Sequence, residues 1–413
     1  MKASLLQKAR AHYQPKLPKA LVGSVKVKEG VPTESVGNQD EIKKLFPNTY
    51  GMPIIEFVPG EDCSIEGKNV GVILSGGQAP GGHNVICGIF DAVKKQNPNN
   101  KVYGFLMGPS GLIDHEYIEL TDEYVEDYRN TGGFDMIGSG RTKLEKIEQF
   151  EKGREILEEL NIKALVIIGG DDSNTNACVL AEYYAAKNYG IQVIGCPKTI
   201  DGDLKNEQIE TSFGFDTATK VYSELIGNIE RDANSARKYW HFIKVMGRSA
   251  SHIALECAMQ CQPNVCLISE EVEQKDMTLN QIVEDLAKVV ANRAEDGNNF
   301  GVVLVPEGLI EFVPAISRLI DELNDLLAAH GEDYRDLEPE AQREYILAHL
   351  SEANAATYET LPQDVAHQLS LDRDPHGNVQ VSLIETEKLL SDMVDAKLDE
   401  WESEGKYVGS FAA

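Results

Sequence analysis

Glycines, carboxylates and cations recur in this sequence directly after short apolar runs. The first such segment, SGGQAPGGHN at residues 75–84, places four glycines before a helical pattern. Glycine lets the backbone approach an anion closely, and a helix N-terminus adds N–H donors and a positive dipole. The segment lacks the glycine spacing of the dinucleotide fingerprint and the final Lys-Ser/Thr of the P-loop. We expect Gly76 and Gly77 to bind phosphate, with a tight structural turn as the alternative.

Two further segments carry charge at the same kind of position. Arg141 lies in GSGRTK, residues 138–143, before a predicted helix, and its guanidinium matches phosphate geometry. An ordinary surface arginine is the alternative. Farther along, GGDDS at residues 169–173 opens a helix predicted from residue 174. One of Asp171 and Asp172 can cap that helix, and the other can hold Mg²⁺, a cation that prefers carboxylate and phosphate oxygen.

A fourth segment, GCPKTIDGDLK at residues 195–205, combines two carboxylates with two lysines. Asp201 and Asp203 offer a proton acceptor and a metal carboxylate, and Lys198 and Lys205 offer positive charge for phosphate. Phosphoryl transfer depends mainly on positioning and charge neutralisation, with a carboxylate orienting or deprotonating the attacking hydroxyl. A solvated polar loop is the alternative.

Two later turns add polar groups after apolar runs. Met246-Gly247-Arg248 follows the run at residues 241–245, and Glu307 follows the run at residues 300–305. The arginine could bind a sugar phosphate and the glutamate a sugar hydroxyl, although either could equally lie in a surface turn.

The elements that must position these residues alternate along the chain. We expect strands at residues 70–74, 102–107, 164–168, 192–195, 241–245, 265–268 and 300–305, and helices at residues 84–95, 144–160, 174–187, 217–231, 249–259 and 279–293. This alternation predicts parallel strands with crossover helices, and the continuous apolar runs predict sheets that are covered on both faces. Ligands of such sheets gather at the carboxyl ends of the strands, where the segments above lie.

Composition limits the class of protein. The chain has 413 residues, 42% of them hydrophobic, which is enough for more than one core. A formal net charge of −28 argues against a nucleic-acid partner, and no apolar stretch of eighteen residues predicts a membrane span. Seven scattered cysteines indicate buried thiols in a reducing cytoplasm more than a zinc site. We expect a cytoplasmic protein.

In this order, the segments resemble the phosphofructokinase family over about residues 68–310. ATP-using members carry Gly-Gly-Asp-Gly and Pro-Gly-Thr-Ile-Asp where this chain has Asp172 and Lys198, so the chain resembles the pyrophosphate-dependent branch. A second carboxylate repels a nucleotide α-phosphate, and a lysine adds charge for a pyrophosphate leaving group. The resemblance implies a doubly wound α/β fold of mainly parallel sheets, with two Rossmann-like domains.

The resemblance also implies a role for each motif. Gly76, Gly77, Arg141, Lys198 and Asp172 would contact the pyrophosphate donor, with the last three acting in catalysis beside Asp201. Asp171 and Asp203 would hold Mg²⁺, and Asp201 would accept the proton of the sugar 1-hydroxyl. The residues that would bind fructose 6-phosphate are Thr199, Ile200, Asp201, Lys238, Tyr239, Met246, Gly247, Arg248 and Glu307.

The domain organisation follows from the same resemblance. We expect an N-terminal extension of little periodicity at residues 1–66, a donor domain at 67–210 and an acceptor domain at 211–310. Residues 311–413 would form a helical insert, with helices at residues 316–329, 338–354 and 386–402, and the chain's end. The extension and the insert resemble the larger, plant-type members of the family.

Two features of the resemblance concern neighbouring chains and the acceptor site. Lys238 and Tyr239 resemble residues that reach the substrate of a neighbouring subunit, which implies a homo-oligomer, at least a dimer. Family members continue into a His-x-x-Gly-Tyr-Glu-x-Arg segment that this sequence lacks, so the acceptor domain is expected to be incomplete. An ATP-dependent kinase and a non-catalytic regulatory subunit of the same fold remain alternatives.

Overall fold

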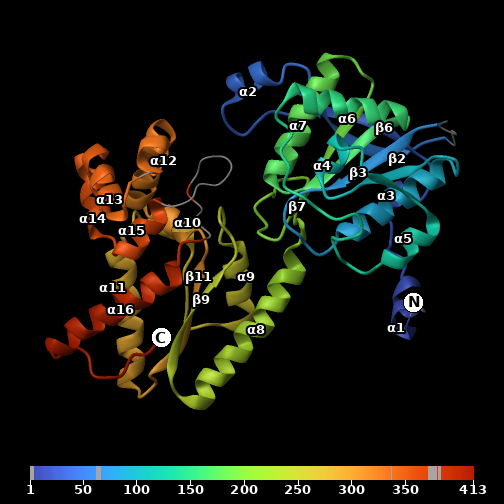
Figure 1. The fold of residues 1–413 in the computed structure, drawn as a ribbon. Helices are drawn as coiled ribbons and strands as arrows, with labels where there is room; N and C mark the ends of the chain where they lie inside the picture. The colour runs from blue at the N-terminus through green and yellow to red at the C-terminus, as the bar shows by residue number, and fades with distance from the viewer. Residues whose placement is uncertain (1–3, 62–66, 336, 371–378, 380–382) are drawn as a thin grey trace. The chain divides into compact units, whose positions relative to one another are not determined.

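The computed structural model describes residues 4–61, 67–335, 337–370, 379 and 383–413 (Figure 1). Cys63 lies outside the described residues. The chain divides into two compact units. The first comprises Met1–Ile200 and Leu204–Gly214, and the second comprises Asp201–Asp203 and Phe215–Ala413.

The first unit is built on a six-stranded sheet in the order β5-β4-β3-β6-β7-β8. Its strands are β3 (Asn69–Leu74), β4 (Val102–Phe105), β5 (Tyr117–Leu120), β6 (Ile162–Gly169), β7 (Gln192–Thr199) and β8 (Phe213–Gly214). Every neighbouring pair is parallel except β4 and β5, which are antiparallel. The predicted mainly parallel sheet is confirmed, and the antiparallel edge strand β5 is an addition to it.

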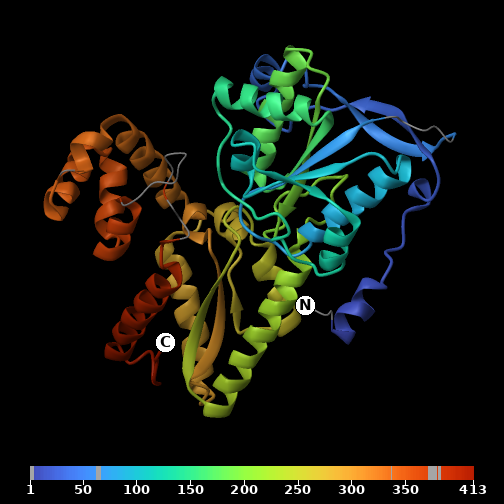
Figure 2. The same cartoon turned by 45° about the vertical axis from the view of Figure 1, so that its right-hand side comes forward.

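Helices cover both faces of this sheet (Figure 2). Val72 and Leu74 pack with α3 (Gly82–Gln96) and α5 (Asp122–Tyr128), whereas Ile73 packs with the helices of the opposite face. That face carries α4 (Pro109–Ile113), α6 (Ile147–Glu159) and α7 (Asp171–Ala186). Burial on both sides explains why the strands read as continuous apolar runs.

The winding of the sheet places the predicted site residues. From β3 the chain passes to β4 on one side and then to β6, β7 and β8 on the other. Ligands of open α/β sheets bind outside the strand carboxyl ends at such a reversal. The segments that follow β3, β6 and β7 therefore meet at one edge of the sheet.

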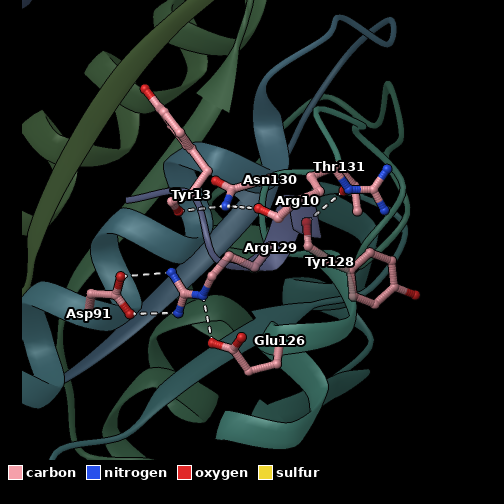
Figure 3. Close-up of polar contacts among 8 residues, drawn as sticks. All are labelled: Arg10, Tyr13, Asp91, Glu126, Tyr128, Arg129, Asn130 and Thr131. Atoms are coloured by element: carbon pink, nitrogen blue, oxygen red, sulfur yellow. Dashed lines mark hydrogen bonds and ion pairs between the residues drawn. The ribbon is translucent and has the colours of Figure 1, made fainter. Parts of the chain in front are cut away.

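The N-terminal extension contains more structure than its sequence was expected to hold. Its elements are α1 (Leu5–Ala11), η1 (Lys19–Leu21), β1 (Val25–Pro32), α2 (Gln39–Leu45) and β2 (Pro53–Pro59), with β1 and β2 paired antiparallel. Asn130 Nδ2 donates to Arg10 O and Tyr13 O, both at 2.9 Å (Figure 3). The extension is thus attached to the first unit by hydrogen bonds.

The second unit is built on three parallel strands in the order β10-β11-β9. These are β9 (Tyr239–Val245), β10 (Val265–Cys266) and β11 (Phe300–Pro306). One face contacts α8 (Phe215–Ala236) and α9 (His252–Cys261), as Figure 1 shows. On the other face, Val303 and Val305 pack with α11 (Leu279–Glu295) and α16 (Thr386–Ser403).

The remaining helices of the second unit share that core. They are α10 (Ser269–Gln274), η2 (Leu309–Phe312), α12 (Pro314–Arg335), α13 (Pro339–His349), α14 (Glu352–Thr360) and α15 (Gln363–Ser370). The single helix predicted over residues 338–354 is wrong, because α13 ends at His349 and α14 is preceded by its N-cap residue, Ser351. Its N–H and hydroxyl bind Glu322 of α12 at 2.7 and 2.8 Å, which holds this break in place. No helix within the described ranges is long and apolar enough to cross a membrane.

Candidate active site

The glycine turn after β3 closes against α7 and β7. Gly76 has a φ of +85°, and a Cβ there would lie 3.6 Å from Ser173 Oγ and 3.8 Å from Lys198 Nζ. Ser173 Oγ donates to Ser75 Oγ at 2.8 Å, and both side chains are buried. The absence of a side chain at Gly76 therefore leaves space beside a buried ammonium group.

Lys198 lies inside a strand, whereas the sequence predicts a loop at this position. The strand expected to end at residue 195 runs on to Thr199, because Lys198 and Thr199 pair with Phe213 and Gly214 of β8. The Lys198 residue is 7% exposed, and its Nζ donates to Gly77 O at 2.7 Å. Strand pairing and this hydrogen bond fix a positive charge at the glycine turn.

Arg141 approaches the same turn from the segment between α5 and α6. A Cβ at Gly77 would lie 3.4 Å from Arg141 Nη2, and Gly76 N donates to Gly140 O at 2.9 Å. Arg141 lies before a helix, as predicted, although that helix, α6, begins at Ile147 and not at residue 144. The residue is exposed and irregular in backbone, and contact with the glycine turn sets its position. We call Gly76, Gly77, Arg141 and Lys198 the donor cluster.

Asp171 and Asp172 are the first two residues of α7, which begins three residues earlier than predicted. The expectation that one of them caps the helix is wrong, because the N-cap is Gly170. The Asn174 side chain forms hydrogen bonds there instead, because its Nδ2 donates to Gly169 O and Gly170 O at 2.8 and 2.7 Å. Both carboxylates are exposed in the first helical turn, where the helix dipole favours negative charge.

The carboxylates fit a magnesium ion that arrives with a phosphate ligand. Among the residues that the structure describes, no three or more His, Cys, Asp or Glu side chains gather into a metal site. Mg²⁺ usually keeps several waters and takes one or two protein carboxylates together with substrate phosphates. An exposed carboxylate such as Asp171 suits that arrangement, whereas an all-protein cage does not fit the described residues.

A second group of predicted residues meets where β9 and β11 end. Gly247 has a φ of +127°, and its N–H donates to Glu307 Oε2 at 3.3 Å. Gly308 N donates to Gly247 O at 3.2 Å, and no Cβ would fit at Gly308 against the Arg248 carbonyl. Met246 and Arg248 are exposed on either side of Gly247. We call Met246, Gly247, Arg248 and Glu307 the acceptor cluster.

Two titratable residues near these groups were missed by the sequence reasoning. Burial raises the pKa of Glu311 in η2, while the charge of Arg248 lowers it and the charge of Glu307 raises it. Burial also raises the pKa of Tyr222 in α8, and the negative charge of Asp201 raises it further. A single glutamate or a helical tyrosine carries no spacing signal, which explains why neither was predicted.

The acidic segment at the end of β7 spans the division between the units. Thr199 and Ile200 belong to the first unit, and Thr199 O accepts from Ser212 Oγ at 2.6 Å. Asp201 and Asp203 belong to the second unit and are half-buried. Between them, Gly202 has a φ of +74°, and its carbonyl lies 3.0 Å from His252 Nδ1.

Lys238 and Tyr239 are not brought to the acceptor cluster within the second unit. Tyr239 is the first residue of β9 and pairs with Phe300, whereas Met246 follows the last residue of that strand. Tyr239 is exposed with a φ of +74°, and Lys238 Nζ lies 5.0 Å from its ring centroid. A positive φ is unusual for a bulky residue. The predicted contact with a neighbouring subunit's substrate stays a prediction.

Comparison with known proteins finds relatives that align along nearly the whole chain. The phosphofructokinase family model matches residues 69–359. A protein of Porphyromonas gingivalis named pyrophosphate–fructose 6-phosphate 1-phosphotransferase is 64% identical over 413 residues, 100% of this chain and 75% of the relative. A protein of the same name from Entamoeba histolytica is 54% identical, over 96% of this chain and 74% of the relative.

A solved structure shows the same fold. The pyrophosphate-dependent phosphofructokinase of Marinobacter aquaeolei aligns with a TM-score of 0.50 and 23% identity, over 61% of this chain and 64% of that one. At this identity the likeness concerns the fold alone. The family match covers well over half of the chain and both relatives align along nearly all of it. The chain therefore belongs to the phosphofructokinase family and groups with the relatives named pyrophosphate–fructose 6-phosphate 1-phosphotransferases.

Proposed function

We propose that this chain transfers a phosphoryl group reversibly from pyrophosphate to the 1-hydroxyl of fructose 6-phosphate, giving fructose 1,6-bisphosphate and phosphate. The observation that carries the proposal is the buried ammonium of Lys198 at the glycine turn, 2.7 Å from Gly77 O. The names of the relatives from Porphyromonas gingivalis and Entamoeba histolytica support the same reaction.

The donor cluster binds and orients pyrophosphate. The backbone at Gly76 and Gly77 lets phosphate oxygens approach, and Lys198 and Arg141 neutralise the charge that develops on the leaving phosphate. Fixed charges of this kind stabilise a phosphoryl-transfer transition state without reorganising during the reaction. Asp171 and Asp203 would hold Mg²⁺, which supplies further charge neutralisation when it is bound.

The acceptor residues place the sugar and take its proton. Asp201 accepts the proton of the 1-hydroxyl as the hydroxyl oxygen attacks phosphorus. Arg248 binds the 6-phosphate, and Glu307, which Gly247 N–H orients at 3.3 Å, accepts from a sugar hydroxyl. The remaining positions that would line the sugar site are Thr199, Ile200, Met246 and Gly247. Lys238 and Tyr239 would extend it from a neighbouring copy.

Donor choice rests on charge at two positions. Asp172 lies in the first turn of α7, shortly after the end of β6, and its carboxylate is exposed. A carboxylate there repels the α-phosphate of a nucleotide, and Lys198 compensates the charge of a short, doubly charged leaving group. For this reason we favour a pyrophosphate-dependent reaction over that of an ATP-dependent kinase.

Organisation and location complete the proposal. We place the extension at residues 1–66, a donor domain at 67–210, an acceptor domain at 211–310, and a helical insert at 311–413, in a homo-oligomer of at least two copies. Exposed Lys238 and Tyr239 support the oligomer. The six described cysteines are all free thiols, which supports a cytoplasmic location.

The experiment is a side-by-side assay of fructose 1,6-bisphosphate formation with pyrophosphate and with ATP, each with Mg²⁺. We expect turnover with pyrophosphate and little with ATP. A reversed preference would support the ATP-dependent kinase. Absence of turnover with both donors, together with intact binding of fructose 6-phosphate, would support a non-catalytic subunit.

A further inference from the structure

His83 lies at the second position of α3, directly after the glycine turn, and its side chain is 3% exposed. Its Nδ1 lies 2.6 Å from Thr131 Oγ1, which itself lies 2.6 Å from Tyr128 O (Figure 3 draws the second contact). A hydroxyl has one hydrogen and a carbonyl has none, so Thr131 donates to Tyr128 O. The Thr131 oxygen must then accept from His83, which means that Nδ1 carries the ring proton.

The other ring nitrogen of His83, Nε2, is a hydrogen-bond acceptor. The backbone N–H groups of Asp135 and Met136 both donate to Nε2 at 2.9 Å, which requires this nitrogen to be unprotonated. The ring is therefore neutral, in its Nδ1–H form. The Asp135 carboxylate is 73% exposed and lies 2.9 Å from Nε2, so it would pair with this nitrogen if the ring gained a proton. Burial lowers the pKa of His83, and Asp135 acts in the opposite direction.

The segment that His83 holds, residues 129–146 between α5 and α6, also contacts the donor cluster. His83 N donates to Gly133 O at 3.0 Å, which ties the segment to the start of α3. The Phe134 ring fills the space that a Cβ at Gly82 would need, and Lys198 Nζ lies 5.5 Å from its centroid. A cation at this distance from an aromatic face is attracted to it.

The same segment is fixed at both of its ends. At its start, Arg129 donates to both oxygens of Asp91 on α3, at 2.8 and 2.9 Å, and to Glu126 at 2.6 Å (Figure 3). At its far end, Gly140 O accepts from Gly76 N, directly before Arg141. The middle of the segment is held by the His83 ring together with hydrogen bonds from Gly81 N to Gly132 O and from Tyr124 Oη to Met136 O. Among these attachments, the one made by the ring changes when the histidine gains a proton.

We propose that His83 is a positioning residue for the donor site, whose neutral ring holds Phe134 against the Lys198 ammonium and Arg141 beside Gly77. The inference rests on the proposed function of the donor cluster, because the buried His83 side chain would act on that cluster only through residues 129–146. Protonation of Nε2 removes the two N–H bonds from Asp135 and Met136 and lets Nε2 donate to the Asp135 carboxylate, which lies 2.9 Å away. The acceptor cluster shares none of these contacts.

Two substitutions separate the hydrogen-bond donor role of Nδ1 from the hydrogen-bond acceptor role of Nε2. The amide of His83→Asn can replace Nδ1–H as a donor to Thr131 but cannot reach the position of Nε2. The amide oxygen of His83→Gln can replace Nε2 as the acceptor. We expect His83→Asn to raise KM for pyrophosphate by about 10- to 100-fold, the scale of a misplacement of about 1 Å, with little change in KM for fructose 6-phosphate. His83→Gln should restore most of the loss.

The pH dependence gives a readout that a merely structural residue would not move. Wild-type kcat/KM for pyrophosphate should fall, relative to His83→Gln, as pH decreases below the ordinary histidine pKa of about 6.5, because burial lowers the pKa of His83. His115→Gln is the matched control, because this exposed histidine contacts Lys152 O and takes part in none of the segment's attachments named above. It should leave both KM values and the pH profile unchanged.

Three outcomes would overturn the inference: unchanged KM for pyrophosphate in His83→Asn, an equal rise in both KM values, or a wild-type pH profile that matches that of His83→Gln. If His83→Asn does not fold, Thr131→Val removes the acceptor of Nδ1–H and must show the same selective rise. Calorimetric titration with magnesium pyrophosphate on the full chain separates the two proposals. Binding without turnover would contradict only the proposed function, and the variants can then be compared by Kd.

Discussion

Lys198 Nζ donates to Gly77 O at 2.7 Å, and this hydrogen bond joins the end of β7 to the turn after β3. The lysine is buried while its charge faces the backbone that is expected to contact phosphate. A buried cation is costly unless it is hydrogen-bonded and later paired with an anion. The bond therefore holds the ammonium at the turn that is expected to bind pyrophosphate.

Removing this cation should weaken the donor site selectively. We expect Lys198→Met to raise KM for pyrophosphate and to lower kcat, in total by about 10²- to 10³-fold in kcat/KM, the cost of losing one fixed charge partner of the transition state. KM for fructose 6-phosphate should change little. Steady-state kinetics test this, with Lys205→Met as the control, because Lys205 is exposed in the same sequence segment. Equal effects of the two substitutions would contradict the role given to Lys198.

Donor preference should change when both charges of the pyrophosphate-type motif are removed. Asp172→Gly combined with Lys198→Gly should raise ATP turnover relative to pyrophosphate turnover, because the repulsion of a nucleotide α-phosphate is gone. Asp172→Gly alone should depress the pyrophosphate reaction. Measuring both donors at matched Mg²⁺ concentration tests this, and an unchanged donor ratio in the double variant would contradict the charge argument.

The sequence predicted the sheet and the meeting of Gly76, Gly77, Arg141 and Lys198, because strand carboxyl ends in a parallel sheet must lie together. It did not predict that Lys198 is inside a strand, since Pro197 suggests the end of one and only pairing with β8 extends it.

The hairpin of the N-terminal extension could have been predicted. In β1, Val25 and Val27 alternate with Lys26 and Lys28, the period of a strand with one polar face. Glu311 and His83 could not have been assigned a place in the same way. Their surroundings come from segments distant in sequence, which is a property of packing and not of local spacing.

Glu311 should make stability depend on pH. Its pKa in the folded chain is raised above that of the unfolded chain, chiefly by burial. The folded state is thus favoured while the carboxyl is protonated, and this contribution is lost as pH rises through the folded pKa. Glu311→Gln should accordingly raise the unfolding temperature at pH 7, and the difference from wild type should shrink toward pH 4. A variant that is less stable at pH 7 would show that pairing with Arg248 outweighs burial.

The N-terminal extension should loosen when Glu182 is removed from α7. Its carboxylate accepts from Thr49 N at 2.9 Å, from Thr49 Oγ1 at 2.8 Å and from Asn48 N at 3.1 Å. Although burial raises the pKa of Glu182, these hydrogen bonds lower it overall. Glu182→Ala should speed proteolysis and amide exchange around residues 46–50, whereas Glu155→Ala, at an exposed position on α6, should not. Identical exchange in the two variants would show that other contacts hold the extension.

Asp201 is predicted to be the base that accepts the proton of the sugar 1-hydroxyl. Its Oδ1 is buried in the second unit, near enough to Tyr222 for its charge to raise that phenol's pKa, so the carboxylate lies in surroundings of reduced polarity. Asp201→Ser should lower kcat by about 10²- to 10⁴-fold, the range for a lost general base, and change KM for pyrophosphate little. Asp203→Ser separates this role from metal binding. Added Mg²⁺ should restore part of the activity that is lost in Asp203→Ser, whereas it should not restore the activity that is lost in Asp201→Ser. A near-normal kcat in Asp201→Ser would mean that Asp203 or water accepts the proton.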